Sequence, residues 1–334
     1  MRIALDVMGG DLGPRATVEG AYLYLLENSD GDKVYLIGDE VQIKEQLKKI
    51  PVNFHERLEI VHAPENISMN ESPIEAFKKK KNSSMGAGLR LHSQNDVDAF
   101  VSAGHTGAQM AGSLLTLKRI PGVNRPAIGS FIPSEKGMIF LIDVGANTDC
   151  KPVHLLQFAI MGDIFVSEVF DQSKLSIGLL SNGEEEKKGN ELTIKAHQLL
   201  KKNLKNFQGN VEGRDLFKGT TDIIVCDGFV GNVMLKMAES VMGLVIKSLK
   251  KNIGSNIFTN IGALLVKPAF SELKKSYDYE EYGGVPLLGV NGISIICHGK
   301  SSAKAIKNGL KVAKNMKSNN VNQLIAKRLN KQES

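Results

Sequence analysis

Short apolar runs alternate with helical patterns along the whole chain, and this alternation limits the possible folds more than any other feature. The runs are rich in Val and Ile, as in strands buried on both faces. Between them, apolar residues recur at spacings of three and four, which predicts helices. The pattern therefore predicts an α/β fold, a three-layer α/β/α sandwich with a mostly parallel sheet. The expected strands are Ile3–Val7, Lys33–Ile37, Leu58–His62, Ala99–Ser102, Met138–Val144, Leu175–Leu180, Ile223–Cys226 and Ile293–Cys297.

The composition is that of a folded globular chain with one large domain or two. Of the 334 residues, 42% are hydrophobic and 23% are charged, which allows a large buried core and excludes wholesale disorder. No composition break, low-complexity tract or repeat interrupts the chain. We therefore expect a single α/β domain over residues 1–334, with two interleaved lobes as the alternative.

Composition also excludes several classes of protein. Aromatic residues make up 6% and Trp is absent, which disfavours a base-stacking nucleic-acid surface. No apolar run reaches the roughly 18 residues of a spanning helix, and Met1–Asp6 has the pattern of a strand and not of a signal peptide. Three widely spaced cysteines, Cys150, Cys226 and Cys297, favour a reducing, cytoplasmic setting over a disulfide framework.

Glycine turns follow five of the expected strands. In an open α/β sheet, the turns at the carboxyl ends of strands line the ligand crevice. Glycine lets the backbone approach a ligand, and helix N-termini offer unpaired N–H groups. Several such turns at one edge predict a site for a small anion, although each turn taken alone is better explained as a tight turn between strand and helix. They are Gly9-Gly10-Asp11, Gly104-His105-Thr106-Gly107, Gly145-Ala146-Asn147, Asp227–Asn232 and Gly299-Lys300-Ser301.

The common nucleotide, metal and nucleophile signatures are absent from the sequence. No G-x-G-x-x-G follows the first strand, and Gly299-Lys300-Ser301 lacks the first glycine of a P-loop because Ser294 stands there. The seven histidines show no metal-ligand spacing, and no G-x-S-x-G nucleophile elbow occurs. We therefore expect neither a metal nor a cofactor.

Three segments leave two interpretations open. Residues Asn182–Asn190 form either a solvated charged loop or a mobile loop that brings a lysine to an anion. Val230–Lys251 is apolar around most of its circumference, so it is either a central buried helix or a helix of a dimer bundle. Ile257–Val266 is too short to span a bilayer, and its residues alone favour the core over membrane contact.

The net charge of +6 is concentrated at the C-terminus. Residues 300–334 hold nine Lys or Arg and one acid, Glu333, for +8; elsewhere 33 basic and 35 acidic residues give −2. Lys300, Lys304, Lys307, Lys311 and Lys314 fall within an arc of about 80° on the predicted helix. This stripe is either a solvated face or a docking surface for an acidic protein or anionic lipid.

Eight motifs occur in a fixed order over nearly the whole chain: Met8–Pro14, Lys80–Met85, Ser102–Ala108, Asp143–Asn147, Gln157–Gly162, Glu185–Asn190, Asp227–Asn232 and Tyr282–Gly284. Each motif alone is modest, but the set is specific. It resembles the phosphate acyltransferase family of bacterial phospholipid synthesis, the PlsX family.

The resemblance implies transfer of a long-chain acyl group from acyl carrier protein to inorganic phosphate, giving acyl phosphate for phospholipid synthesis. It implies a homodimer with a fold similar to isocitrate and isopropylmalate dehydrogenases and to phosphate acetyltransferases. It also implies peripheral membrane attachment through a projecting helical pair at about residues 230–275, with a membrane glycerol-phosphate acyltransferase as a further partner. The membrane tip would be Ile257, Phe258, Ile261, Leu264, Leu265 and Val266.

By the resemblance and the turns together, we assign the site residues. Phosphate is itself the attacking group, so N–H donors and a lysine suffice to stabilise the developing charge. The expected catalytic residues are Lys188, Asn232 and Asp227. The expected phosphate or acyl phosphate ligands are Gly9, Gly10, Asp11, Gly104, His105, Thr106, Gly107, Asn147, Gly189, Asn190, Gly228 and Gly231. The expected carrier-docking residues are Lys78, Lys79, Lys80, Lys81, Lys307 and Lys311.

Two positions depart from the family pattern, and three other functions remain as alternatives. The family usually has Asn where His105 stands and often Asn where Ser181 stands. The alternatives are a phosphate acyltransferase that uses coenzyme A thioesters, an NAD- and metal-dependent dehydrogenase, and a non-enzymatic membrane-surface scaffold. The dehydrogenase lacks its glycine fingerprint, and the scaffold does not explain the glycine turns.

Overall fold

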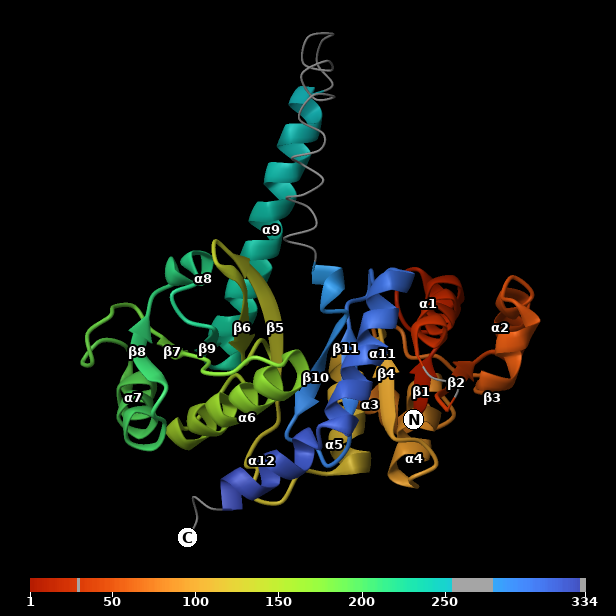
Figure 1. Cartoon of the computed structure of the whole chain (residues 1–334), viewed down its shortest axis with the longest axis horizontal. Coiled ribbons are helices and arrows are strands. Elements are labelled where there is room, and N and C mark those ends of the chain that lie inside the picture. The colour runs from red at the N-terminus through yellow and green to blue at the C-terminus, as the bar shows by residue number, and fades with distance from the viewer. Residues whose placement is uncertain (29–30, 254–278, 331–334) are drawn as a thin grey trace. The chain divides into compact units, whose positions relative to one another are not determined.

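The computed structural model describes residues 1–28, 31–253 and 279–330, and it divides the chain into two compact units (Figure 1). Unit 1 comprises Met1–Gly129, Ile160–Ser173 and Glu280–Ser334, and unit 2 comprises Ser130–Ala159 and Lys174–Tyr279. Each unit is therefore built from stretches that are distant in the sequence.

The sheet of unit 1 is mostly parallel. Its order is β3-β2-β1-β4-β11-β10, followed by the start of β5, and only β10 runs antiparallel to its neighbours. Leu5 of β1 lies opposite Val101 of β4, and Ser102 lies opposite Ile296 of β11, so these three parallel strands end at one edge. The bounds are β1 Arg2–Asp6, β2 Lys33–Gly38, β3 Leu58–His62, β4 Ala99–Ser102, β5 Ala127–Ser134, β10 Gly284–Leu288 and β11 Ser294–Cys297.

Helices cover the strands of unit 1 in two groups. Helix α11 packs along α1, whereas α3, α4 and α5 pack together over a core that includes Ala4, Ile37 and Phe100. Figure 1 shows α11 beside α1. The bounds are α1 Gly13–Glu27, α2 Glu40–Leu47, α3 Pro73–Lys79, α4 Ser84–Ser93, α5 Thr106–Leu117, α11 Ala303–Ser318 and α12 Val321–Asn330, with 3₁₀ turns at Val52–Arg57 and Tyr279–Glu281.

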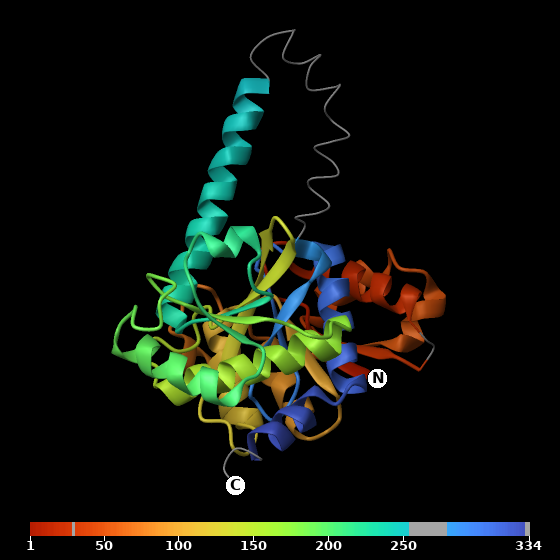
Figure 2. The same cartoon turned by 60° about the vertical axis from the view of Figure 1, so that its left-hand side comes forward.

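The sheet of unit 2 begins with the end of β5 and continues β6-β9-β7-β8, with the last four strands parallel. Its core contains Leu141, Leu180 and Ile224. Helix α9 is long and extends well beyond the strands in both views (Figures 1 and 2). The bounds are β6 Gly137–Ile142, β7 Ile177–Leu180, β8 Phe207–Val211, β9 Ile223–Val225, α6 Pro152–Phe170 (shared with unit 1), α7 Glu191–Asn203, α8 Asp215–Lys218 and α9 Gly228–Ile253.

The predicted fold class is confirmed, and all eight expected strands are present within two residues of their expected bounds. Three further strands were not predicted: β5, β8 and β10. Each contains glycine or proline, and the antiparallel β10 carries Pro286 at its centre. Proline lacks an N–H donor and argues against a strand within a sheet, so the sequence pattern alone did not predict β10.

The prediction of a long helix after Val230 is confirmed, but its alternative as a central buried helix is wrong for this chain. The exposed fractions are 52% for Val233, 62% for Met237, 50% for Val241 and 64% for Leu244. These residues are spaced by three or four positions, so they form one apolar stripe on the outside of α9.

Two described helices are long and apolar enough to span a membrane by length and composition alone. The first is α6. Its most apolar 18-residue window is 67% buried, as in a core helix. The second is Gly228–Val245 of α9, which is only 11% buried. The expected membrane tip at Ile257–Val266, and with it the second helix of the projecting pair, lies outside the described residues.

The C-terminal lysine stripe on α11 is not the open basic surface that the charge count suggested. Acids of unit 1 pair with its members: Lys304 lies 2.5 Å from Glu281, Lys314 lies 2.7 Å from Asp32, and Lys307 and Lys311 both pair with Glu27. Hydrogen bonds from Lys311 and Lys307 hold the pKa of Glu27 below its ordinary value. The stripe therefore joins α11 to the rest of unit 1.

The run Lys78–Lys81, at the end of α3, has more unpaired positive charge than the lysine stripe on α11. Lys80 lies 2.7 Å from Glu71, and Lys79 lies 4.0 Å from Glu75. Lys78 and Lys81 are exposed and stand outside the ion pairs found among the described residues. Of the six expected carrier-docking lysines, these two are the most available to an acidic partner.

Candidate active site

A buried carboxylate orders the turn after β6 in unit 2. Asp143 has no exposed surface. Its Oδ1 accepts hydrogen bonds from the Gly145 and Ala146 amides at 3.2 and 2.9 Å. Its Oδ2 accepts from the backbone N–H and the side-chain Nδ2 of Asn147, both at 2.8 Å. One side chain thus fixes the whole turn that carries Asn147.

The N-terminus of α9 is fully engaged by protein groups. The Gly228 amide donates to the Asn147 carbonyl at 2.7 Å. The Phe229 and Val230 amides both donate to Asp227 Oδ1 at 3.0 Å, and the Gly231 amide donates to the Asp227 carbonyl at 3.0 Å. Asp227 therefore acts as a helix N-cap. The expected binding of phosphate by the amides of this turn is not supported, because each amide already has an acceptor.

The two glycines of this turn are required for close packing. A Cβ on Gly228 would lie 2.8 Å from the Asn147 backbone nitrogen, and one on Gly231 would lie 1.9 Å from the Asp143 carbonyl oxygen. Any side chain at either position would push α9 away from the turn. Asn232 follows, with its Cγ 3.6 Å from the position of a Cβ on Gly145. The structure thus brings Asp227, Asn232 and Asn147 together.

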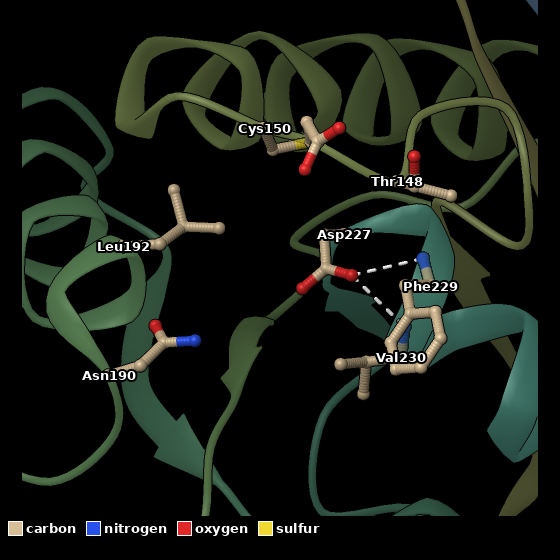
Figure 3. A pocket seen from close by; sticks show the side chains of 8 residues that line it. Thr148, Cys150, Asn190, Leu192, Asp227, Phe229 and Val230 are labelled. Atoms are coloured by element: carbon tan, nitrogen blue, oxygen red, sulfur yellow. Dashed lines mark hydrogen bonds between the residues drawn. The ribbon is translucent and has the colours of Figure 1, made fainter.

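A pocket of about 550 Å³ lies beside this turn in unit 2. Figure 3 shows Asn190 and Leu192 on one side and Phe229 and Val230 on the other. One Asp227 oxygen accepts both capping bonds in this view. The lining mixes apolar and polar groups: Thr148, Asp149, Cys150, Asn190, Leu192, Asp227, Phe229 and Val230.

Sequence reasoning placed Asn190 and the turn Asp227–Asn232 at the site but missed Thr148, Asp149, Cys150 and Leu192. Thr148, Asp149 and Cys150 directly follow the expected turn Gly145–Asn147, so extending that motif by three residues would have found them. Cys226 and Cys297 are buried, and burial raises the pKa of both thiols, that of Cys297 to about 12. None of the three cysteines forms a disulfide with another described residue, and Cys150 alone of the three is partly exposed.

The loop that carries Lys188 is ordered by buried polar groups. Asn210 Nδ2 donates to the Glu185 carbonyl at 2.8 Å, and His197 Nδ1 lies 2.9 Å from Asn210 Oδ1. The Lys188 amide then donates to the same Glu185 carbonyl at 2.9 Å. The backbone of this loop is therefore anchored, and the exposed Lys188 side chain runs beside Gly183.

The end of the loop leads directly into α7. Gly189 has a φ of +105°, a conformation that favours glycine. Asn190 caps α7, with its Oδ1 accepting from the Thr193 amide at 2.9 Å. Lys188 does not line the pocket, although Asn190 does.

Unit 1 contains a second turn ordered by a buried aspartate. Asp6 ends β1 and is 2% exposed. Its Oδ1 accepts from the Met8 and Gly9 amides at 3.1 Å, and its Oδ2 accepts from Ser102 Oγ at 2.7 Å. Burial raises the pKa of Asp6, against the lowering effect of the hydrogen bonds from Ser102, Met8 and Gly9.

Three of the expected turns of unit 1 are in mutual contact. A Cβ on Gly9 would lie 2.6 Å from the Gly104 nitrogen, and one on Gly10 would lie 3.0 Å from the Gly299 carbonyl oxygen and 3.2 Å from Ala103 Cβ. The Asp11 amide donates to the same Gly299 carbonyl at 2.6 Å. The expectation that these turns gather at one sheet edge therefore holds within unit 1.

The N-terminus of α5, which begins at Thr106, has no side-chain cap among the described residues. Its N-cap position is His105, whose Nε2 lies 3.1 Å from the Glu71 carbonyl oxygen. His105 Nδ1 is buried and has no hydrogen-bond partner in the part of the chain that the structure describes. The first amides of α5, at Thr106 and Gly107, therefore remain available to an anion.

The two units thus use the same local plan with one difference. In each, a buried aspartate stands at or directly after the end of a strand, and the parallel strand beside it leads into Gly-x-x-Gly near the start of a helix. The residue before the first glycine is Ala103 in unit 1 and Asp227 in unit 2. Helix α5 begins at Thr106, and its N-cap residue His105 makes no side-chain capping bond, whereas α9 begins at Gly228 directly after its cap Asp227.

Among residues 1–28, 31–253 and 279–330, no group of three His, Cys, Asp or Glu side chains has the arrangement of a metal site. The ordered groups of both turns are backbone amides, carboxylates, hydroxyls and carboxamides.

The fold is shared with solved phosphotransacetylases. A phosphotransacetylase from Streptococcus pyogenes matches with a TM-score of 0.64 at 17% identity, over 95% of this chain and 94% of that one. EutD phosphotransacetylase from Staphylococcus aureus matches with a TM-score of 0.58 at 14% identity, over 94% of each chain. At these identities the likeness establishes the fold, which is that of this class of acyl-transferring proteins.

The family follows from sequence. Residues 1–324 match the model of the fatty acid synthesis protein family, and the chain belongs to that family. A phosphate acyltransferase from Pelotomaculum thermopropionicum is 50% identical over 318 residues, 94% of this chain and 91% of the relative. One from Dictyoglomus turgidum is 49% identical, over 99% of this chain and 98% of the relative. The predicted resemblance is confirmed, and the chain is an acyltransferase.

Proposed function

We propose that the enzyme transfers a long-chain fatty acyl group from the thioester of acyl carrier protein to inorganic phosphate, giving acyl phosphate for phospholipid synthesis. The family membership and the names of the relatives support the reaction class. The observation that carries the assignment of phosphate is the uncapped N-terminus of α5 in the turn Gly104–Gly107.

Phosphate is assigned to unit 1 because, of the two helices that follow a Gly-x-x-Gly motif, only α5 has uncapped first amides among the described residues. The α9 amides are held by Asp227 and Asn147, whereas the α5 amides have no cap among the described residues. A helix N-terminus favours an anion through both its N–H groups and its dipole. The unpartnered Nδ1 of His105 is a further polar atom at this turn.

The chemistry needs no covalent intermediate on the protein. A phosphate oxygen attacks the thioester carbonyl carbon, the C–S bond breaks, and the carrier leaves as a thiolate that takes up a proton. Thiolate is a stable leaving group, since a free thiol has a pKa of about 8.5. The protein then has to hold the reactants and to stabilise negative charge on the carbonyl oxygen. We assign the second task to the Lys188 ammonium and the side-chain amide of Asn232.

Asp227 takes a different role from the one expected for a general catalyst. Its Oδ1 is used by the α9 cap, which fixes the carboxylate at the pocket. We assign it to ordering the start of α9, which carries Asn232. The apolar side chains of Leu192, Phe229 and Val230 suit the first carbons of an acyl chain.

The donor is proposed to be acyl carrier protein, with an acyl-coenzyme A thioester as the alternative. An acidic carrier needs unpaired cations on its docking surface, which Lys78 and Lys81 supply. Lys307 and Lys311 are bound to Glu27, so docking there would have to replace an existing ion pair.

A homodimer is proposed from the outer stripe of α9. Val233, Met237, Val241 and Leu244 expose about half or more of their surface along one face of a single helix. A large apolar stripe on a surface helix marks an interaction site, and a second copy of α9 would cover it with matching residues. By the resemblance, we also propose a cytoplasmic enzyme held peripherally on the membrane, which flotation with phospholipid vesicles tests.

The function is tested with purified enzyme, phosphate and two acyl donors. We expect acyl phosphate, detected as acyl hydroxamate after hydroxylamine treatment, with acyl carrier protein thioester as the preferred donor. A preference for the coenzyme A thioester would establish the alternative donor. Absence of acyl phosphate with both donors would contradict the proposed function.

The phosphate site is tested by Thr106→Asp, with Thr106→Asn as the matched neutral control. Thr106 is exposed at the first position of α5, where a carboxylate stabilises the helix but repels a bound anion. We expect Thr106→Asp to raise the KM for phosphate by about tenfold or more, because a like charge a few ångströms away opposes binding. Thr106→Asn should change this KM by less than about threefold. Equal effects of the two variants would exclude phosphate from this turn.

Lys188 is tested by Lys188→Ala, with Lys187→Ala as the neighbouring control. Both lysines are exposed, and the backbone of the loop is held by Asn210 and not by either side chain. We expect Lys188→Ala to lower the rate of acyl phosphate formation by about tenfold or more, because it removes the cation opposite the developing oxyanion. A rate unchanged in Lys188→Ala would show that the loop is only a solvated surface.

The dimer is tested by Met237→Glu at the centre of the α9 stripe. A charge at an apolar contact is costly to bury, so we expect the variant to elute with the mass of one chain and the wild type with the mass of two. Light scattering during gel filtration measures both. Lys236→Glu, which lies off the stripe on the same turn of the helix, should leave the mass unchanged. A wild-type protein of single-chain mass would contradict the dimer.

A further inference from the structure

The carboxylate of Asp143 is joined to the proposed catalytic residues by a short chain of hydrogen bonds. It receives the side-chain Nδ2 and the amide of Asn147, each at 2.8 Å. The carbonyl of Asn147 then receives the Gly228 amide at 2.7 Å. Gly228 is the first residue of α9, and Asn232 lies one turn further along this helix.

We infer that Asp143 is a positioning residue for acyl transfer. It fixes Asn147, and through Asn147 it fixes the start of α9 that carries Asn232 and the Asp227 cap. Asp143 has no exposed surface and does not line the pocket, so it acts on the reaction only through the groups that it holds. This inference rests on the proposed function for the role of Asn232.

The positioning role of Asp143 also changes the function that we assign to Asn147. Asn147 was predicted to bind phosphate, but its Nδ2 donates to Asp143 and its backbone carbonyl accepts from Gly228. It is 9% exposed. We therefore assign Asn147 to the link between Asp143 and α9, and not to direct contact with the anion.

Unit 1 gives independent support, because the same plan recurs there with different residues. Asp6 ends its strand, is buried, and accepts from the Met8 and Gly9 amides. Its other oxygen accepts from Ser102 Oγ, which in turn accepts from the Gly104 amide at 2.9 Å. The link from aspartate to the glycine of the neighbouring turn thus passes through Ser102 in unit 1 and Asn147 in unit 2. Different linkers for the same connection indicate that the connection itself matters.

Replacing the Asp143 carboxylate would leave buried donors unpaired. Its Oδ1 accepts from the Gly145 and Ala146 amides, and its Oδ2 accepts from the backbone N–H and Nδ2 of Asn147. In Asp143→Asn, one oxygen becomes an NH₂ group that cannot accept, so two buried N–H groups lose their acceptor. Since a buried unsatisfied donor is costly, the turn has to shift, and Asn147 and Gly228 move with it.

The test is steady-state kinetics of Asp143→Asn, with Asp215→Asn as the matched control. Asp215 is also a buried aspartate of unit 2, and its Oδ2 accepts from the Glu212 amide at 2.8 Å, but it does not line the pocket. We expect Asp143→Asn to lower kcat by about tenfold or more, because it displaces groups that act in the transition state. The KM for phosphate should change by less than about threefold. Asp215→Asn should keep kcat within about twofold, because its turn touches no reacting group.

Two further measurements separate positioning from loss of fold. In Asp143→Asn, amide hydrogen exchange should speed up at Gly145–Asn147 and at Gly228, and circular dichroism should remain that of the wild type. Asn147→Ala removes the side-chain Nδ2 bond to Asp143 and keeps the two backbone bonds of Asn147, so it weakens the same link with a smaller change. It should also lower kcat, and the double variant should lose no more than the worse single variant. If Asp143→Asn does not fold, Asn147→Ala carries the test alone.

The inference is overturned if exchange speeds up while kcat stays within about threefold of the wild type, or if the two single losses multiply in the double variant. A wild-type enzyme that makes no acyl phosphate would instead contradict the proposed function. The exchange measurement needs no turnover, so it reports on the link from Asp143 to Gly228 in either case.

Discussion

A buried carboxylate must be supplied with hydrogen-bond donors, and this requirement shapes both functional turns. Asp6 is the last residue of an interior strand and Asp143 directly follows another, and both side chains are buried away from water. The nearest donors are the amides of the next few residues, so the chain has to fold back over its own aspartate. The first glycine of each neighbouring motif packs directly on the aspartate: a Cβ on Gly104 would lie 3.2 Å from Asp6 Oδ2, and one on Gly228 would lie 3.0 Å from Asp143 Oδ2. The first glycine of each motif is therefore required by the aspartate beside it.

The two helix starts built on this plan differ in the charge that they offer. Asp227 puts a carboxylate on the first amides of α9, which satisfies them and makes the pocket locally negative. At α5 the N-cap residue is His105, which makes no side-chain capping bond, so the first amides of α5 and the positive end of its dipole carry no capping carboxylate. A phosphate ion would compete with a covalently attached carboxylate at α9 but has no such competitor at α5. This difference between the two helix starts is the reason that we assign the anion to unit 1.

The sequence predicted the parallel strands well because each is a compact run of Val, Ile and Leu whose period is visible locally. It did not predict β5, β8 or β10, where Pro133, Gly209 and Pro286 break the pattern and pairing with neighbours overrides local preference. The motifs also located Asp227, Asn190 and the turns, since glycine spacing is local. They could not distinguish a capped helix from an uncapped one, because capping depends on where a carboxylate points. For the same reason the role of Asp143 was not visible in its motif.

The C-terminal lysines show most directly why the net charge of a segment does not give the charge of a protein surface. Residues 300–334 carry +8 as a segment, yet Lys304, Lys307, Lys311 and Lys314 face acids that lie elsewhere in the sequence. Asp32 binds Lys314 and the N-terminal ammonium at once; burial alone would raise its pKa, but hydrogen bonds from Lys314, the ammonium and Tyr24 hold the pKa below its ordinary value. These pairs tie the last long helix to the first one, so the lysines serve the architecture of unit 1. Free positive charge for an acidic partner then has to come from lysines without such partners, and the short run at the end of α3 provides it in Lys78 and Lys81.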